Sequence, residues 1–325
     1  MTKAIRFSQT GGPEVLTLED VPQPEPGPGD ILVSNRAIGL NYIEIYFRSG
    51  VYPVPFLPSG LGTEGAGVVE AVGADVADFQ VGDRVAYAQA PLGSYAEQHV
   101  MPAEKAIGIP DAVDFETAAA TMLKGLTVQY LLRQTYPVKA GETILFHAAA
   151  GGVGLIACQW AKALGVKLIG TVSSPEKAKL AMDNGAWATI NYKEENIVER
   201  VRELTGGEMV PVVYDSVGQD TWETSLNCLQ KRGLMVSFGN TTGPVSGVNI
   251  GILNQKGSLF VTRPSLAGYA DTRASFEAMC GELFEMLASG AIKADINQRF
   301  PLADAAKAHE ALASGQTTGS TVLLP

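Results

Sequence analysis

The chain has 325 residues, 46% hydrophobic and 18% charged, which is enough for about two domains and a sizeable core. Its 24 basic and 34 acidic residues give a net charge of -10, which argues against a nucleic-acid-binding surface and a polybasic membrane anchor. Three cysteines without a Cys-x-x-Cys pair form neither a disulfide framework nor a structural zinc site. No apolar run suits a signal peptide or a membrane-spanning helix, so we expect a cytoplasmic protein.

Up to about residue 110, short apolar runs alternate with turns rich in Gly and Pro. This pattern is typical of a β-rich domain. We expect strands near residues 31–33, 67–69, 84–87 and 97–100.

From about residue 115, helical and strand patterns alternate. Asp114 is suited to cap a helix through residues 117–120, a second helix is expected over 126–134, and Ser174 should cap a helix that begins at Pro175. The other expected elements are strands at 143–146, 167–172, 189–190, 210–214, 234–238 and 320–324, and helices at 153–164, 197–204, 276–287 and 303–312. Alternating helices and apolar strands predict an α/β fold with a parallel sheet covered on both faces.

The segment 144–154 predicts a strand, a glycine-rich turn and a helix in direct succession. Gly151, Gly152 and Gly154 allow close approach to a pyrophosphate, and the helix N-terminus offers N–H donors and a positive dipole to the anion. The spacing alone is a weak dinucleotide signal, and the flanking strand and helix strengthen it. The alternative is a tight turn in which small residues serve packing only.

The residues that follow this turn bear on the choice of cofactor. Folds that prefer NAD place an acidic residue at the end of the second strand, but residues 155–175 contain none. Ser173, Ser174 and Lys177 instead suit a 2′-phosphate, which predicts NADPH. Tyr192 is expected to stack near the adenine or to reach the phosphate, although Lys177 and Tyr192 can equally be plain surface residues.

Seven stretches carry a resemblance to a known family: NYIEIY (41–46), GTEGAGVVEAVG (62–73), VGDRV (81–85), KGLTV (124–128), HAAAGGVG (147–154), YDSVG (214–218) and VSFGN (236–240). The chain resembles the medium-chain dehydrogenase/reductase superfamily, specifically its zinc-free quinone oxidoreductases related to zeta-crystallin, and is nearest to bacterial NADPH:quinone reductases. The similarity runs nearly from end to end. It is less specific for the substrate, because enoyl and alkenal reductases share most of these motifs.

The resemblance implies an interrupted architecture. Residues 1–123 and 265–325 would form a GroES-like catalytic domain, and residues 124–264 an inserted Rossmann domain that binds NADP(H), with the active site in the cleft between the domains. The family pairs Rossmann domains into homodimers through edge strands. The apolar run 257–262 is expected to be such a strand, unless its own chain covers it.

The resemblance also bears on metal use. The alcohol dehydrogenases of this superfamily hold a catalytic zinc through a Cys and a His, and the corresponding residues here are Asn41 and Thr63. An amide and a hydroxyl are not normal zinc ligands, so we expect no metal. The acceptor must then be electrophilic by itself, as quinones and α,β-unsaturated carbonyls are.

The expected catalytic residues are Asn41, Tyr46, Tyr52 and Thr63. Asn41 and Thr63 can donate hydrogen bonds to a carbonyl oxygen as negative charge develops. Either tyrosine can donate a hydrogen bond, stack on a quinone or relay a proton, or can simply pack at the surface. The expected cofactor-binding residues are Asn41, Thr127, Ala150, Gly151, Gly152, Val153, Gly154, Ser173, Ser174, Lys177, Tyr192, Ser216, Phe238, Gly239 and Asn240.

The leading hypothesis is metal-free reduction of quinones by NADPH, with a hydride or single electrons passing from the nicotinamide to the quinone. One alternative is a zinc-free enoyl or 2-alkenal double-bond reductase, and another is a non-enzymatic dinucleotide-binding or RNA-binding crystallin-like protein. Near the nucleotide, Thr127 is expected beside the nicotinamide or as a helix-start hydroxyl, and His147 as a buried, hydrogen-bonded residue. Asp215 can act electrostatically or hold a turn.

Overall fold

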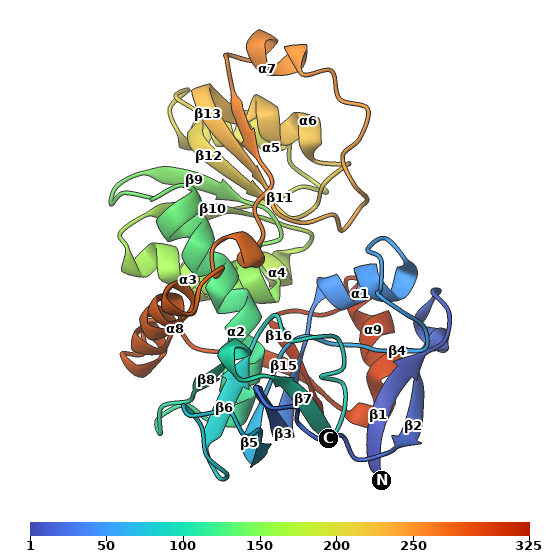
Figure 1. Ribbon diagram of the computed structural model, residues 1–325. Coiled ribbons are helices and arrows are strands. Elements are labelled where there is room, and N and C mark those ends of the chain that lie inside the picture. Colours follow the sequence, from blue (N-terminus) through green and yellow to red (C-terminus); the bar gives the residue numbers. More distant parts are fainter. The chain divides into compact units, whose positions relative to one another are not determined.

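The computed structural model describes residues 1–325 and divides into two compact units. The first, here called the β-rich domain, consists of Met1–Leu126 and Ala270–Pro325. The second, here called the parallel-sheet domain, consists of Thr127–Tyr269. The chain therefore leaves the β-rich domain once and returns to it, as the colours of Figure 1 show. The predicted division has the same order of segments and sets each boundary a few residues earlier.

Two sheets form the framework of the β-rich domain. Its strands are β1 (Thr2–Phe7), β2 (Thr17–Val21), β3 (Asp30–Leu40), β4 (Ser59–Gly60), β5 (Gly65–Val72), β6 (Arg84–Tyr87), β7 (Gln98–Pro102), β8 (Ala106–Gly108), β15 (Ile296–Pro301) and β16 (Ser320–Leu324). The larger sheet has the order β15-β16-β3-β5-β6-β8, with β7 also paired to β3, and the smaller has the order β2-β1-β4. Since β16 pairs with β3, the end of the chain lies inside the larger sheet.

Four helices accompany these sheets: α1 (Tyr42–Ser49), α2 (Phe115–Tyr130), α8 (Arg273–Ala288) and α9 (Ala305–Ala313). The sequence analysis named only strands before residue 110, so it missed α1. Asn41 caps α1, the Glu44 carboxylate accepts the Asn41 backbone N–H at 2.7 Å, and Gly50 ends the helix with a φ of 81°. These start and stop signals outweigh the surrounding β pattern.

Helix α2 is continuous, whereas the sequence predicted two helices. Gly125 lies inside it because the helix packs closely against α8: a Cβ atom there would lie 2.5 Å from Cδ1 of Leu283. The predicted cap is confirmed, since the Asp114 carboxylate accepts the Thr117 backbone N–H at 2.7 Å. A short π-helical turn, Leu131–Thr135, follows α2.

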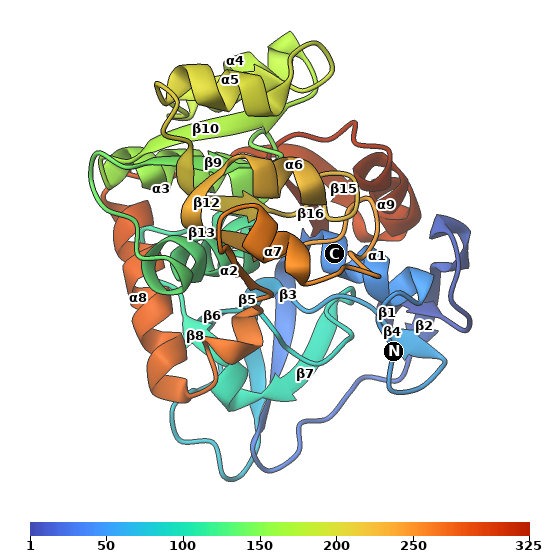
Figure 2. The same ribbon diagram turned by 90° about the horizontal axis from the view of Figure 1, so that it is seen from above.

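The parallel-sheet domain has one six-stranded sheet, in the order β11-β10-β9-β12-β13-β14. Its strands are β9 (Thr143–Phe146), β10 (Lys167–Val172), β11 (Ala188–Asn191), β12 (Val210–Asp215), β13 (Leu229–Ser237) and β14 (Phe260–Thr262), and all neighbours are parallel. Its helices are α3 (Gly152–Ala163), α4 (Pro175–Asp183), α5 (Ile197–Leu204), α6 (Trp222–Asn227) and α7 (Gly251–Gln255). Figure 2 shows β10, β9, β12 and β13 side by side.

The order of strands reverses beside β9, which is flanked by β10 and β12. Right-handed crossovers therefore place α3 and α4 on one face of this sheet and α5 and α6 on the other. On the second face, Val201 of α5 and Leu226 of α6 pack in one buried cluster with strand residues such as Leu145 and Ile169. Ligands of such sheets bind at the carboxyl ends of the strands, at this reversal.

Most predicted elements of the parallel-sheet domain agree with the structure. Ser174 caps α4, with Pro175 as the first helical residue. Strand β13 begins at Leu229, earlier than predicted. The residues between Leu229 and Gly233 are polar and exposed, so they show no apolar strand pattern. The short helices α6 and α7 were not predicted, since neither is long enough to show a helical period.

Candidate functional site

The glycine-rich turn joins β9 to α3 and brings backbone segments very close together. A Cβ atom at Gly154 would lie 2.4 Å from the Ala148 carbonyl oxygen, so this position requires glycine. Gly151 caps α3, and Ala148 has a φ of 55° in the left-handed region. The turn therefore presents a helix N-terminus with little side-chain cover, which suits a pyrophosphate.

Most of the expected cofactor-binding residues gather at the carboxyl ends of these strands. Residues 150–154 follow β9, Ser173 and Ser174 follow β10, Tyr192 follows β11, Ser216 follows β12, and residues 238–240 follow β13. Gly239 lies against Ser216, because a Cβ at Gly239 would be 2.4 Å from the Ser216 carbonyl oxygen. Two expected residues do not follow a strand of this sheet: Thr127 lies inside α2 and not at a helix start, and Asn41 caps α1 in the β-rich domain.

The loop between β10 and α4, together with the first turn of α4, offers hydroxyls and a cation. Ser174 Oγ accepts the Lys177 backbone N–H at 3.3 Å, which fixes the first turn of α4 beside Ser173. The Lys177 side chain is half-buried, and Tyr192 is 50% exposed. Residues 155–175 contain no carboxylate, and the next one, that of Glu176, is hydrogen-bonded to Ser174.

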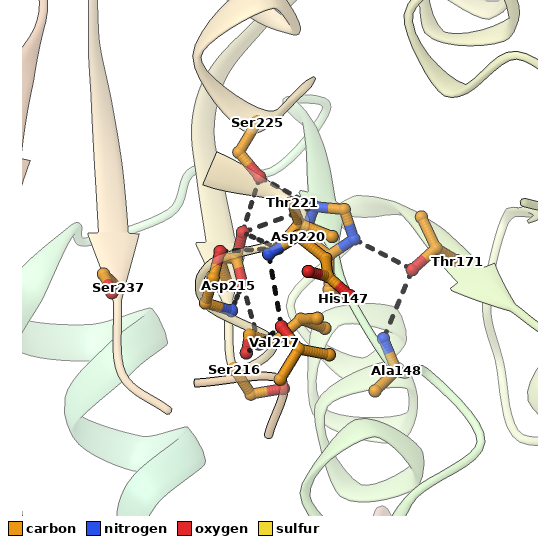
Figure 3. A network of polar contacts seen from close by, with 12 residues as sticks. His147, Ala148, Thr171, Asp215, Ser216, Val217, Asp220, Thr221, Ser225 and Ser237 are labelled. Atoms are coloured by element: carbon orange, nitrogen blue, oxygen red, sulfur yellow. Dashed lines mark hydrogen bonds and ion pairs between the residues drawn. The ribbon is translucent and has the colours of Figure 1, made fainter. Parts of the chain in front are cut away.

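At the glycine-rich turn, four buried side chains and the backbone N–H of Ala148 form one chain of hydrogen bonds (Figure 3). Ser225 Oγ donates to Asp215 Oδ2 at 2.6 Å and lies 2.9 Å from His147 Nε2. His147 Nδ1 lies 3.0 Å from Thr171 Oγ1, which accepts the Ala148 backbone N–H at 3.3 Å. This chain, here called the His147 network, links the strained turn residue Ala148 to β10, β12 and α6.

The donors in this network define the state of the imidazole. The Ser225 proton is directed at Asp215, so His147 Nε2 must donate to Ser225, and Nδ1 must accept from Thr171. Burial lowers the pKa of His147, and the Asp215 charge opposes this only in part, so the ring is neutral. The expectation of a buried, hydrogen-bonded His147 is confirmed.

Asp215 also organises the loop that follows β12. Its Oδ1 accepts the backbone N–H groups of Val217 and Gly218 at 2.7 and 3.0 Å, and its Oδ2 accepts the Thr221 hydroxyl at 2.6 Å. Of the two roles considered for Asp215, the turn-holding role is therefore the one seen. The carboxylate is completely buried and positions the loop that follows β12.

In the β-rich domain, Asn41 and Thr63 lie beside two carboxylates and one ammonium. Asn41 Nδ2 donates to Glu64 Oε2 at 2.8 Å, and Thr63 Oγ1 lies 3.3 Å from Glu44 Oε1. Lys124 Nζ lies 3.5 Å from Glu64 Oε2. All five side chains are at most 9% exposed. We call this set the Glu44 cluster.

The charges in the Glu44 cluster are unequal, because two carboxylates face a single ammonium. Burial and the charge of Glu64 raise the pKa of Glu44 to about 8, opposed by Lys124 and by the Asn41 backbone N–H. Glu64 is stabilised as an anion by Lys124, by Asn41 and by the Leu123 backbone N–H at 2.6 Å. Near neutral pH the cluster therefore holds one ionised carboxylate and one protonated carboxyl group.

Sequence reasoning did not identify Glu44, Glu64 or Lys124 as site residues. Three signals were available: an Asn–x–x–Glu capping box at 41–44, a carboxylate set among small residues, and a lysine within an apolar helix. Gly39 is also part of the arrangement, since a Cβ there would lie on Glu64 Oε2. A buried charge of this kind needs partners and marks a candidate site.

The two expected aromatic residues lie together: Tyr46 is in α1, and Tyr52 follows this helix. The ring centroids of Tyr46 and Tyr52 are 5.2 Å apart in an edge-to-face arrangement, and the Tyr52 N–H donates to the Tyr46 carbonyl at 3.0 Å. The ring centroids of Phe47 and Tyr52 are 5.8 Å apart, also in an edge-to-face arrangement. All four expected catalytic residues therefore belong to the β-rich domain, on or near α1.

The two domains of this chain match two known protein families. Residues 27–111 match the family described as alcohol dehydrogenase GroES-like domain, and residues 152–284 match the one described as zinc-binding dehydrogenase. With its GroES-like domain and its parallel Rossmann sheet, the protein is of the medium-chain dehydrogenase/reductase class.

Relatives that match over the full length of the chain show which family of this class it belongs to. A quinone oxidoreductase of Pseudomonas aeruginosa is 66% identical over 325 residues, which is 100% of both chains. The crystal structure of Escherichia coli quinone oxidoreductase complexed with NADPH matches with a TM-score of 0.98 and 59% identity, covering 99% of this chain and 100% of that one. A 2-haloacrylate reductase of a Burkholderia species is 43% identical, covering 100% of this chain and 99% of its own. The chain belongs to the quinone oxidoreductase family.

The zinc ion that the second family description implies does not fit this donor set. Asn41 and Thr63 offer an amide and a hydroxyl, and the adjacent Lys124 ammonium would repel a cation. No group of three His, Cys, Asp or Glu side chains could hold a metal ion, and the three cysteines are buried free thiols at separate positions.

A search for membrane-spanning segments finds no helix with the length and apolar character that a span requires.

Proposed function

We propose that this protein reduces quinones with NADPH and without a metal ion. The observation that carries the proposal is that one chain has both a dinucleotide-type turn and the Glu44 cluster, whose lysine, amide and hydroxyl are not zinc ligands. The full-length similarity to quinone oxidoreductases supports the same conclusion.

The parallel-sheet domain would hold NADPH at its strand ends. The N–H groups of the turn at residues 150–154 and the start of α3 would bind the pyrophosphate, and residues 216 and 238–240 would line the remainder. Ser173, Ser174, Lys177 and Tyr192 would receive the 2′-phosphate, because they offer hydroxyls and a cation. The bound nicotinamide supplies the reducing equivalents.

The β-rich domain would hold the acceptor. Asn41 and Thr63 are suited to contact its oxygen, and Tyr46 and Tyr52 to lie along its ring. One neutral donor of the oxyanion-hole kind contributes about 3 kcal/mol, well below the roughly 8 to 23 kcal/mol of enzymatic accelerations. The acceptor must therefore be reactive by itself, as a quinone is.

Steady-state kinetics with 1,4-benzoquinone, 9,10-phenanthrenequinone and 2-hexenal tests this function. We expect NADPH-dependent turnover of both quinones and little of 2-hexenal. The reverse result would favour the double-bond reductase, a candidate supported by the similarity to 2-haloacrylate reductase. An RNA-binding role has no support from a net charge of -10, and tight, salt-sensitive RNA retention on filters would be needed to revive it.

We further propose a homodimer that pairs copies through β14. This strand is at the edge of the six-stranded sheet, and its Phe260 and Val261 side chains are 60% and 39% exposed. An exposed apolar edge strand favours pairing with another chain. Sedimentation should show a dimer at micromolar concentration, and a monomer would refute this assembly.

The three buried free thiols support the cytoplasm as the protein's compartment.

A further inference from the structure

The Glu44 cluster divides its charge and its proton between two carboxyl groups. Glu64 receives three stabilising contacts, from Lys124 Nζ at 3.5 Å, Asn41 Nδ2 at 2.8 Å and the Leu123 N–H at 2.6 Å. Glu44 receives one backbone donor, the Asn41 N–H at 2.7 Å, and its Oε1 lies 3.3 Å from Thr63 Oγ1. With a single ammonium for two buried carboxyl groups, Glu64 holds the charge and Glu44 holds a proton.

Other ionisable groups around Glu44 do not offer a second counter-charge. Glu64 precedes β5, Lys124 is on α2, and Tyr95 precedes β7 and interacts electrostatically with Glu44. Arg48, one turn further along α1, acts on Tyr95 and is not among the charges that act on Glu44. Burial and Glu64 accordingly raise the pKa of Glu44 to about 8.

The position of this proton follows from the hydrogen bonds. Glu44 Oε2 accepts the Asn41 N–H, so the carboxyl proton belongs on Oε1, which is the atom that faces Thr63 Oγ1. When Oε1 donates to Thr63 Oγ1, the Thr63 hydroxyl proton is released to donate onward. Glu44 has no exposed surface, whereas Thr63 retains 9%, so only Thr63 can contact a bound molecule.

We propose that Glu44 is the proton source for quinone reduction and that Thr63 relays its proton to the quinone oxygen. The inference rests on the proposed function. A quinone that gains a hydride needs one further proton to become the hydroquinone. The Thr63 O–H bond breaks as its proton bonds to the quinone oxygen, and the Glu44 O–H bond breaks as its proton replaces the one on Thr63. Glu44 is left as a carboxylate and regains a proton from water after the product leaves.

The first test observes the proton itself, without cofactor or substrate. An infrared pH titration of the protein should show a protonated carboxyl band that disappears as pH rises through about 8. The band should be absent in Glu44→Gln and unchanged in Glu104→Gln, a control at an exposed glutamate of the same domain. A band that persists in Glu44→Gln places the proton elsewhere and overturns the proposal.

The second test follows the relay during turnover. Glu44→Gln and Thr63→Val should each lower kcat for quinone on the order of 100-fold, the usual scale for general acid catalysis, and abolish the solvent isotope effect of the parent enzyme. The dissociation constant for NADPH should stay within about twofold, because neither side chain belongs to the nucleotide edge. Thr63→Ser retains the hydroxyl and should restore most of the rate.

The outcomes separate the relay from the function on which it rests. A parent protein that fails to reduce quinones refutes the proposed function. A parent protein that reduces quinones while both variants keep its rate refutes the relay alone. A Thr63→Ser variant as slow as Thr63→Val also refutes the relay, because the hydroxyl would then not be the required group.

Discussion

Ser225 Oγ lies 2.6 Å from Asp215 Oδ2, and both side chains are completely buried. This bond ends the chain of donors that begins at the backbone N–H of Ala148. The carboxylate therefore orients an imidazole and a threonine that hold the nucleotide turn, although neither group is exposed to a ligand. The network resembles a catalytic triad in composition, and its burial assigns it a positioning role.

Ser225→Ala should destabilise the protein by about 1–3 kcal/mol, because Asp215 loses a donor and His147 Nε2 loses its acceptor. Affinity for NADPH should fall with it, since Ala148 is held less firmly. Urea unfolding and fluorescence titration measure the two effects. Ser289→Ala removes an exposed hydroxyl bonded to the Met286 carbonyl and serves as the control. Equal stability of the two variants would contradict the role given to the network.

Lys177→Ala should weaken NADPH binding by about 10- to 100-fold and leave NADH binding nearly unchanged. A charge-assisted hydrogen bond to a phosphate is worth about 1.5–3 kcal/mol, and only NADPH carries the 2′-phosphate. Isothermal titration with both cofactors measures the difference. Equal affinity of the unaltered protein for NADPH and NADH would refute the assignment.

Tyr52→Ala should raise the KM for a large quinone about fivefold and that for 1,4-benzoquinone less, because it removes a ring that packs edge-on against Tyr46 at 5.2 Å. Tyr52→Phe keeps the ring and should keep the KM. A loss of kcat in Tyr52→Phe would instead make the Tyr52 hydroxyl a proton donor, at the expense of the relay through Thr63. If neither change alters quinone turnover and 2-enoyl substrates turn over well, the quinone assignment fails.

Quinone reduction should continue unchanged in EDTA, because the Lys124 ammonium and the Asn41 amide make a poor zinc site. Elemental analysis of the purified protein should find no stoichiometric zinc. One firmly held zinc per chain, removed together with the activity, would overturn this mechanism.

The proton on Glu44 also links stability to pH. The ordinary pKa of 4.5 applies to the unfolded chain, and folding raises the pKa to about 8. Between these values the unfolded state is ionised and the folded state is protonated, so the contribution of Glu44 to stability is present below about 4.5 and is lost as pH rises to about 8. Glu44→Gln removes this dependence. Its stability relative to the parent should therefore rise across that interval in denaturant titrations, and a constant difference would contradict the raised pKa.

The turns at the carboxyl ends of β9 and β10 could be predicted from the sequence because their signals are local. Gly151 and Gly154 determine a turn within a few residues, and Ser174 with Pro175 determines the start of the next helix. The missing carboxylate after the second strand is also visible in the sequence. Because the strands of this sheet are parallel, their carboxyl ends share one edge, and the loops that follow them come together there.

The Glu44 cluster could not be predicted in the same way. Glu44, Glu64 and Lys124 come from three separate segments, and their contacts depend on how β3, α1 and α2 pack. Gly39 shows this dependence, since its missing side chain leaves the space that Glu64 occupies. Two helices were expected where α2 is continuous, and Gly125, between them, is the small residue that close packing against Leu283 requires.

The pairing of β16 with β3 has a consequence for the order in which the protein is made. Val322 and Leu323 lie opposite Gly39 and Ile38, so an interior strand of the larger sheet leaves the ribosome after the whole parallel-sheet domain. The parallel-sheet domain, Thr127–Tyr269, is complete before that strand exists. During synthesis, the nucleotide domain can therefore fold while the β-rich domain that began first still lacks a central strand and awaits it with an open edge.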